Sequence, residues 1–166
     1  MDYATISADI ISYTSLTNIE RRKLEADIKK LLSELTSKYK DQSFYGRLVK
    51  GDYIECAMKS SKYSLRIALL LKTFIKSVEF SSEKINKTRL KYFFEHGIRL
   101  AVAVAPLTTF DPQKGIIDGE VIYLSGRAIK DHTTSHKQKI VIKNTMFFYS
   151  NDTRIQDLMD PLFSLL

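Results

Sequence analysis

The sequence contains one cysteine and no tryptophan, and it has only three prolines and six glycines in 166 residues. A single cysteine, Cys56, excludes an internal disulfide, and its place in an expected buried strand favours a core thiol. So few prolines exclude proline-rich low-complexity structure. Spacings typical of zinc fingers and of Walker phosphate loops are also missing. These absences leave an ordinary globular chain as the expected class.

Long hydrophobic runs are missing as well. No apolar stretch approaches the roughly 18 residues that a membrane-spanning helix needs. The N-terminus does not show a charged segment followed by an apolar one, as an export signal would. Together with the lone thiol, this pattern predicts a cytoplasmic protein without a membrane partner.

The length and the charge bound the organisation of the chain. A chain of 166 residues predicts one domain, here residues 1–150, followed by a C-terminal helix over 151–166. The net charge of +7 would permit contact with nucleic acid or nucleotides. The basic residues form no run of five or more, which favours solvated helix faces. A basic nucleic-acid-binding module is one alternative function, with binding that falls as salt rises.

Periodicity predicts the order of strands and helices. Thr17 and Glu20 fit a capping box, in which a hydroxyl caps the helix and a carboxylate follows three residues later. Strands are expected over 3–11, 43–50, 53–58, 97–105, 139–142 and 146–149, and helices over 17–39, 60–78, 120–131 and 153–166. Residues 81–91 are expected as a loop or short helix and 107–118 as a loop. Small alternate residues in 97–105 indicate close cover by a helix or a partner subunit.

This order predicts an α+β fold. A βαββαβ arrangement is the ferredoxin-like core, here extended by a further αβ unit. We expect an antiparallel or mixed sheet with helices packed on one face, so that a helix or a second subunit must cover the other face.

Two carboxylates mark the candidate site. Asp52 lies in the expected hairpin turn formed by Lys50, Gly51 and Asp52, and Asp9 lies near the end of the first strand. A carboxylate in a buried strand is costly unless it is paired or binds a metal. The alternative for Asp9 is exposure where the strand becomes a loop. The loop that follows could offer backbone N–H groups to a phosphate.

These positions resemble the class III nucleotide cyclase catalytic domain. Its Asp-x-x-Gly-Phe-Thr pattern matches residues 9–14, with Ser12 in place of Gly and Tyr13 in place of Phe, and its second metal ligand matches Gly51-Asp52. The resemblance implies that Asp9 and Asp52 bind Mg²⁺ or Mn²⁺, with nucleotide phosphates completing the metal's ligands. The residues that it marks for nucleotide or phosphate contact are Ser12, Tyr13, Thr14, Lys50, Arg127 and Lys130.

The sequence also resembles the SatD-like family, whose N-terminal domain is similar to a diverged cyclase domain and is related to GGDEF domains. The matching pieces are Ala8-Asp9-Ile10, the segments 50–55 and 98–103, and Asp118-Gly119 with Gly126-Arg127-Ala128. SatD-like proteins usually continue into a helix-turn-helix. This chain ends before one, which favours a truncated chain and nucleic-acid contact only through a missing segment or weakly by charge.

Departures from the cyclase pattern bear on catalysis. The base-selecting lysine of cyclases corresponds to Leu48 here, and the asparagine and arginine of the last core helix correspond to Lys130 and Thr134. Loss of a transition-state cation typically costs about 10²–10³ in rate. The resemblance therefore implies a catalytically inactive regulatory or dimerisation domain that binds a nucleotide or an anion. The alternative is an active metal-dependent nucleotidyl cyclase, and a homodimer is expected in either case.

Overall fold

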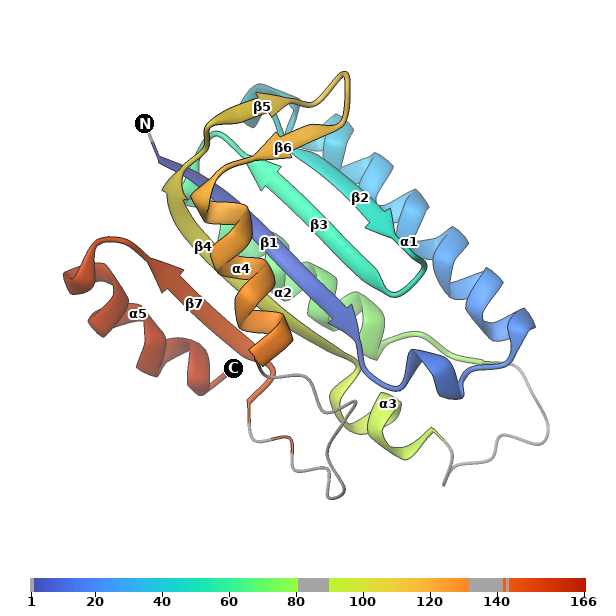
Figure 1. The fold of residues 1–166 in the computed structure, drawn as a ribbon. Coiled ribbons are helices and arrows are strands. Elements are labelled where there is room, and N and C mark those ends of the chain that lie inside the picture. The colour runs from blue at the N-terminus through green and yellow to red at the C-terminus, as the bar shows by residue number, and fades with distance from the viewer. Residues whose placement is uncertain (1, 81–89, 132–141, 143) are drawn as a thin grey trace.

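The computed structural model describes residues 2–80, 90–131, 142 and 144–166 (Figure 1). The strands are β1 (Asp2–Ile10), β2 (Tyr45–Val49), β3 (Tyr53–Met58), β4 (Ile98–Pro106), β5 (Thr109–Asp111), β6 (Ile116–Asp118) and β7 (Met146–Ser150). The helices are α1 (Asn18–Lys38), α2 (Ser64–Lys76), α3 (Lys91–His96), α4 (Glu120–Asp131) and α5 (Thr153–Ser164). Short 3-10 turns lie at Tyr13–Ser15, Lys40–Gln42 and Ser61–Tyr63.

The main sheet is mixed and has the strand order β2-β3-β1-β4-β7. β1 lies in the middle and pairs antiparallel with both β3 and β4, whereas β7 is parallel to β4. A separate small sheet pairs β5 with β6. The α+β class, the βαββαβ core and its extension by α4 and β7 are therefore confirmed.

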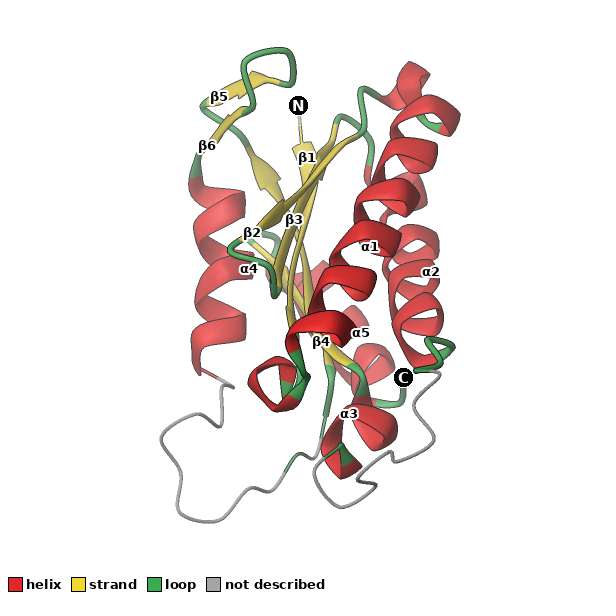
Figure 2. Cartoon of the chain, turned by 90° about the vertical axis from the view of Figure 1, so that its right-hand side faces the viewer, coloured by secondary structure: helices red, strands yellow, loops and turns green. Residues whose placement is uncertain are grey.

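Side chains alternate between the two faces of the sheet because successive residues of a strand point in opposite directions. Ile6 of β1 and Leu100 of β4 point to the face covered by α1 and α2, where the larger core lies. Figure 2 shows α1 and α2 on one side of the sheet and α4 on the other. The expectation of helices on one face therefore holds for α1 and α2 but not for α4.

Small residues explain why α4 can lie close to the second face. Ala101, Ala103 and Ala105 of β4 all point towards it and are buried. The small alternate residues of this strand were expected to allow a helix or a partner subunit to pack closely against it. The structure shows that α4 packs there. They therefore provide no separate argument for a dimer.

Hydroxyl groups fix α4 to the sheet. Ser125 is fully buried and its Oγ lies 2.8 Å from Ser7 Oγ and 3.1 Å from Thr5 Oγ1. Thr5 Oγ1 also donates a hydrogen bond of 3.0 Å to the carbonyl oxygen of Val121. Because buried hydroxyls are costly when unpaired, these hydrogen bonds favour a single position of α4 on the sheet.

The predicted start of α1 is confirmed in detail. Thr17 caps the helix by accepting from the N–H of Glu20, and the Glu20 carboxylate accepts from the N–H of Thr17. Leu24, Ile28 and Leu35 then follow at helical spacing and are buried. Ser60 likewise accepts from the N–H of Lys62 ahead of α2.

Short elements depart from the predictions. The expected loop 107–118 contains the hairpin β5–β6, which turns at Gly115 with a φ of +66°. α3 was not anticipated because six residues carry too little periodicity. The expected strand 139–142 lies outside the described residues except for residue 142, and Thr134 lies outside them too. No helix in the described part of the chain is long and apolar enough to span a membrane.

Candidate functional site

The structure brings Asp9 and Asp52 together at one end of the central strands. Asp9 lies opposite Tyr53 of β3, and the N–H of Ile10 donates a 2.9 Å hydrogen bond to the carbonyl oxygen of Asp52. The Asp52 carboxylate is close enough to act electrostatically on Asp9. Residues 43 positions apart thus become neighbours, and their role as metal ligands stays a prediction.

A third charged residue, Arg99 of β4, belongs to the same cluster. Arg99 lies opposite Asp9 in the β1–β4 register, and its Nη1 lies 3.7 Å from Asp9 Oδ2. Its side chain is only 3% exposed. Arg99 is a charged residue in an otherwise apolar strand, and Asp9 on the neighbouring strand is the acid beside it.

The cluster has unused hydrogen-bonding capacity. Asp9 Oδ1 and Arg99 Nη1 are both buried and have no hydrogen-bond partner. Burial, the largest cause, raises the pKa of Asp9 from 3.8 to about 6; Arg99 acts to lower it and Asp52 to raise it. One orphaned acceptor and one orphaned donor lie next to each other, so a bound polar group could satisfy both.

The two carboxylates can be compared with the needs of the Mg²⁺ or Mn²⁺ that the sequence resemblance implies. The described residues contain no group of three or more His, Cys, Asp or Glu that could hold a metal ion. Magnesium, however, is commonly held by one or two carboxylates together with water and substrate phosphates. The orphaned Asp9 Oδ1 beside Asp52 fits that chemistry, so these two residues could hold such an ion.

The candidate phosphate loop is held by α1. Ser12 adopts a left-handed conformation, and residues Tyr13–Ser15 form a 3-10 turn. Arg21 donates to the carbonyl oxygens of Tyr13 at 3.3 Å and of Thr14 at 2.6 Å. The loop is thus shaped by contacts to its carbonyl groups, and its geometry does not assign Ser12, Tyr13 or Thr14 to a ligand.

Tyr13 connects this loop to the hairpin turn. Its hydroxyl donates to Glu25 Oε1, and the pKa of Tyr13 is raised to about 12, mainly by burial and by this hydrogen bond. Gly51 lies against the pair, because an added Cβ would be 2.6 Å from Tyr13 Oη. Lys50, the neighbouring candidate, is exposed in the turn with a φ of +54°. The glycine thus lets the turn carrying Asp52 approach the loop.

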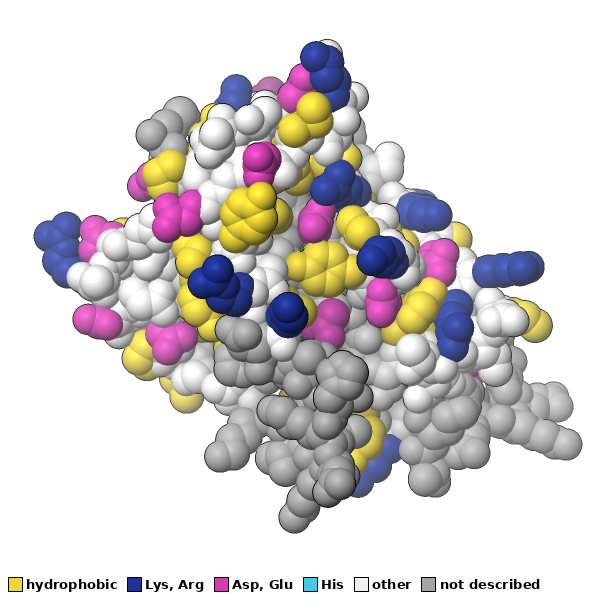
Figure 3. All heavy atoms as spheres, viewed as in Figure 1, with side chains coloured by type: hydrophobic (Ala, Val, Ile, Leu, Met, Phe, Trp, Pro, Cys, Tyr) yellow, Lys and Arg dark blue, Asp and Glu magenta, His cyan; other side chains and the backbone are white. Residues whose placement is uncertain are grey.

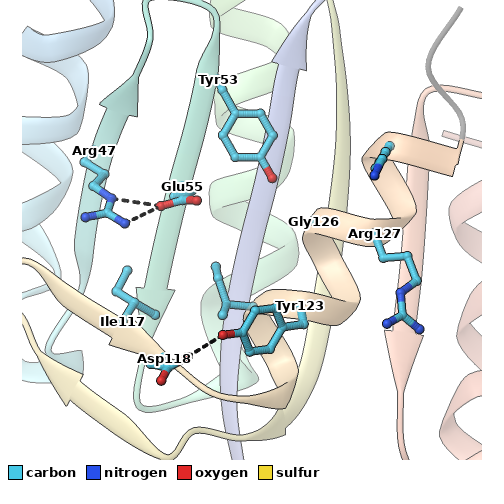
Figure 4. A pocket seen from close by; sticks show the side chains of 10 residues that line it. Arg47, Tyr53, Glu55, Ile117, Asp118, Tyr123, Gly126 and Arg127 are labelled. Atoms are coloured by element: carbon cyan, nitrogen blue, oxygen red, sulfur yellow. Dashed lines mark hydrogen bonds and ion pairs between the residues drawn. The ribbon is translucent and has the colours of Figure 1, made fainter.

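A pocket of about 590 Å³ lies on the α4 side of the sheet. It is lined by Arg47, Tyr53, Glu55, Ile117, Asp118, Ile122, Tyr123, Gly126, Arg127 and Lys130. Figure 4 shows the Tyr53 ring over the sheet beside β1 and shows the Arg127 guanidinium directed away from Tyr53 and Glu55. Across the middle of this face, apolar side chains lie among acidic and basic ones (Figure 3).

Several polar groups of the pocket are already paired. Arg47 Nη2 lies 2.7 Å from Glu55 Oε2, and Arg47 Nη1 donates to the carbonyl oxygen of Gly115 at 2.9 Å. Tyr123 donates to Asp118 at 2.9 Å. Arg127 and Lys130 are the lining cations outside these pairs. The predicted site residues thus fall into two groups, because Asp9 and Asp52 are not among the described residues that line this pocket.

Leu48, at the base-selecting position, does not face the pocket. It packs against the core on the α1 side of the sheet, whereas Arg47 beside it lines the pocket. Strand alternation gives the two residues opposite directions.

Sequence reasoning did not mark Tyr53 as a site residue. Tyr53 is close to Ser7 and Asp9, and burial, the largest cause, raises its pKa. Its place directly after Asp52 was the available signal, because side-chain alternation puts residue 53 on the same face as Asp9.

The α+β fold of this chain is similar to that of nucleotide cyclase domains. No family model matches the sequence, and no curated protein matches it. Among solved structures, the chain resembles a bacterial light-regulated adenylyl cyclase with a TM-score of 0.55 and 13% identity, covering 89% of this chain and 74% of the other. It also resembles the monomeric adenylate cyclases of Trypanosoma brucei, with a TM-score of 0.56 and 15% identity, covering 76% and 67%.

A third similar structure is the non-canonical dimeric guanylyl cyclase domain of a RhoGC fusion protein from Blastocladiella emersonii. Its TM-score is 0.50 and its identity 15%, covering 76% of this chain and 71% of the other. Identities this low establish a shared fold and leave the activity of this chain to be argued from its own residues.

Proposed function

We propose that this chain is a catalytically silent, nucleotide cyclase-like regulatory domain that binds a nucleotide or another phosphate-bearing anion. The observation that supports it best is the buried cluster of Asp9 and Arg99, in which one acceptor and one donor have no partner. A native buried polar atom without a partner calls for an explanation, and an unoccupied ligand position is one.

In this proposal, Asp9 and Asp52 hold Mg²⁺ or Mn²⁺, and the ion neutralises and orients the phosphate groups. Arg99 lies on the other side of Asp9 and could contact a phosphate oxygen through its unpaired Nη1. Lys50 and the loop Ser12-Tyr13-Thr14 flank the same end of the sheet, so we assign them supporting contacts. Arg127 and Lys130 would attract the remainder of the ligand from the rim of the α4 pocket.

The chain lacks the residues with which an active cyclase would recognise the base and stabilise the transition state. Leu48 has no polar group and packs on the α1 side of the sheet. Lys130 replaces an amide that would orient the ribose, and Thr134 replaces an arginine. Loss of one such electrostatic contact costs about 10²–10³ in rate.

The same proposal includes the family relationship of the chain, its cellular location and its regulatory role. We assign the chain to the neighbourhood of the SatD-like family and of GGDEF domains, with a role linked to transcriptional regulation in the cytoplasm. The local motifs at residues 50–55, 98–103 and 118–128 support this assignment.

We further propose a homodimer. Two large apolar side chains are exposed near the α4 pocket, Tyr123 at 63% and Ile116 at 44%. Among the similar structures, one guanylyl cyclase domain is described as dimeric and another as monomeric, so this proposal rests on the exposed residues.

Thermal unfolding in the presence of a ligand tests the binding proposal. GTP or ATP with Mn²⁺ should raise the unfolding midpoint, because a ligand held at 100 times its Kd stabilises the folded state by about 2.7 kcal/mol. Asp52→Ala should abolish the shift, whereas Asp41→Ala, which replaces an exposed acid outside the cluster, should retain it. A midpoint unchanged by nucleotide, with and without Mn²⁺, would contradict the proposal.

A product assay separates the silent domain from the active alternative. Incubation with ATP or GTP and Mn²⁺ should give no cyclic nucleotide above the level of the Asp52→Ala variant. Formation of a cyclic product that Asp52→Ala abolishes would establish an active nucleotidyl cyclase instead. Retention on DNA at low salt, lost steeply as salt rises, would favour the basic nucleic-acid-binding alternative.

A further inference from the structure

The two edges of the main sheet, β2 and β7, are treated differently. At β7, the side chain of Gln156 in α5 takes the place of a neighbouring strand. Its Oε1 accepts from the N–H of Ser150 at 2.8 Å, and its Nε2 donates to the carbonyl oxygen of Phe148 at 3.0 Å. An amide side chain thus pairs with the backbone that an edge strand leaves open.

β2, at the other edge, has no equivalent protection. In the described part of the chain, no side chain bonds to the backbone of Tyr45–Val49 as Gln156 bonds to β7. The side chain of Arg47 is fixed to Glu55 and Gly115, on the α4 face, and leaves the strand's edge open. An unprotected edge in a chain that protects its other edge suggests a use for it.

A groove of about 480 Å³ runs beside this edge, between α1 and β2. Leu32 and Leu48 give it an apolar floor, Ser33 lies on its helix side, and Gly46 lies on its strand side, where Leu32 packs so closely that an added Cβ would be 2.9 Å from Leu32 Cδ2. An edge strand beside a helix, with a groove between them, is the arrangement in which domains bind an extended peptide as an added strand.

We propose that β2 and this groove bind an extended acidic peptide segment of another protein as a sixth strand of the sheet. The peptide backbone pairs with the open edge of β2. Alternate side chains enter the groove and contact Leu32 and Leu48, because residues two apart on a strand share a face.

The charges of the groove favour an acidic partner over a second copy of this chain. None of the described residues that line it is acidic, and Lys29 carries a positive charge on its helix side, whereas the Arg47 side chain is paired with Glu55 on the other face of the sheet. Lys50 is exposed at the end of the strand. If two copies paired antiparallel through the centre of β2, Arg47 would lie opposite its own counterpart, and like charges in cross-strand positions are destabilising.

A capped octapeptide that alternates Asp and Val is a suitable probe, with fluorescence anisotropy and amide hydrogen exchange as readouts. We expect binding tighter than about 1 mM that weakens with salt. The outward-facing amides among residues 45–49, which do not bond to β3, should become protected. The same sequence with N-methylated alternate residues should not bind, because its backbone can no longer pair with the strand.

Matched variants of α1 locate the peptide. Ser33→Trp should fill the groove and abolish binding, whereas Glu34→Trp, next to it on the exposed helix, should leave binding intact. Lys29→Glu should weaken binding about tenfold, as expected when an attractive rim charge becomes repulsive. Lys30→Glu makes the same change of net charge outside the groove and should have a smaller effect.

The outcomes are distinct. No binding of the octapeptide, or binding that Ser33→Trp and N-methylation leave unchanged, would overturn the proposal. Self-association of the unmodified chain that protects residues 45–49 and is lost in Ser33→Trp would assign the edge to a second copy instead. Binding of nucleotide is measured separately, so either proposal can fail without the other.

Discussion

Asp9 is the residue on which the candidate site depends most. It is a carboxylate near the end of a central strand, with a buried guanidinium 3.7 Å away and a second acid as its neighbour. Burial of a carboxylate is expensive, and one cation at that distance offsets it only in part. The raised pKa of Asp9 is the direct expression of this imbalance.

The stability of the protein should therefore fall as this carboxyl ionises. The folded pKa of about 6 exceeds the unfolded value of 3.8, so the contribution is complete below pH 3.8 and is lost as the pH rises through 6. Two pKa units correspond to about 3 kcal/mol. Asp9→Asn should remove this component from urea-unfolding free energies measured between pH 4 and 7 in metal-free buffer.

The control for that measurement is Asp41→Asn, which removes an exposed carboxyl outside the cluster. It should keep the pH dependence of the unmodified chain. If Asp9→Asn changes only the overall stability and leaves its slope with pH unaltered, the titrating group is another residue.

Two glycines should respond in opposite ways to the same substitution. Gly51 has a φ of +81° and an added Cβ would lie 2.6 Å from Tyr13 Oη, so Gly51→Ala should cost about 1–2 kcal/mol or more. Gly126 lies inside α4, where an added Cβ would be 3.4 Å from Tyr53 Oη, an ordinary contact. Gly126→Ala should therefore stabilise the protein by about 1 kcal/mol through helix propensity.

Thermal or urea unfolding of the two variants tests this contrast. A neutral Gly51→Ala would mean that the turn can move away from Tyr13, and the packing of the hairpin against the phosphate loop would need revision. A destabilising Gly126→Ala would indicate that the space beside Tyr53 is tighter than the structure shows.

Among the elements, α5 has a role that its amphipathic pattern does not reveal. Through Gln156 it protects the backbone of β7 at the outer edge of the sheet. Gln156→Leu should cost about 1–3 kcal/mol, because two backbone groups lose their partner. It should also speed hydrogen exchange at the amide of Ser150 and increase aggregation, since an open edge recruits other strands.

Asp160→Asn, on the exposed side of the same helix, serves as the reference for that experiment. It should leave both the exchange rate and the solubility unchanged. Equal exchange of the Ser150 amide in Gln156→Leu and in the unmodified chain would show that the side-chain amide does not protect this edge.

The helices show how far local pattern could be used for prediction. The capping box and the spacing of Leu24, Ile28 and Leu35 specify α1, because they depend only on neighbouring residues. The position of α4 on the opposite face depends on hydrogen bonds among Thr5, Ser7 and Ser125, and Ser125 is far from the other two in sequence. Contacts of that kind leave no local periodicity, so the sequence indicated a covered face without identifying what covers it.

For the molecule as a whole, topology made the site predictable in part. Asp9 near a strand end and Asp52 in a hairpin turn were expected to form one site, and the antiparallel β1–β3 register brings those positions together. Arg99 is a charged residue in an otherwise apolar strand, and the structure identifies its partner as Asp9. The direction of Arg127 away from Tyr53 could not be foreseen, because it depends on how α4 is rotated on the sheet (Figure 4).

Assembly is the prediction that belongs to this scale. We expect light scattering at tens of micromolar protein to give the mass of a dimer. Tyr123→Glu should shift it to monomer by placing a charge in the proposed contact. Leu158→Glu, at a side chain of α5 that is 65% exposed, is the matched control and should remain dimeric. A monomer mass for the unmodified chain would refute the homodimer.

The hold of Gln156 on β7 has a practical consequence for anyone who shortens this protein. Cutting the chain just before Thr153 removes α5 and with it the Gln156 side chain. This would uncover the backbone of Phe148 and Ser150 at the outer edge of β7, a strand that contains two phenylalanines. Such a fragment should associate edge to edge through β7. Shortened versions of the protein should therefore keep α5.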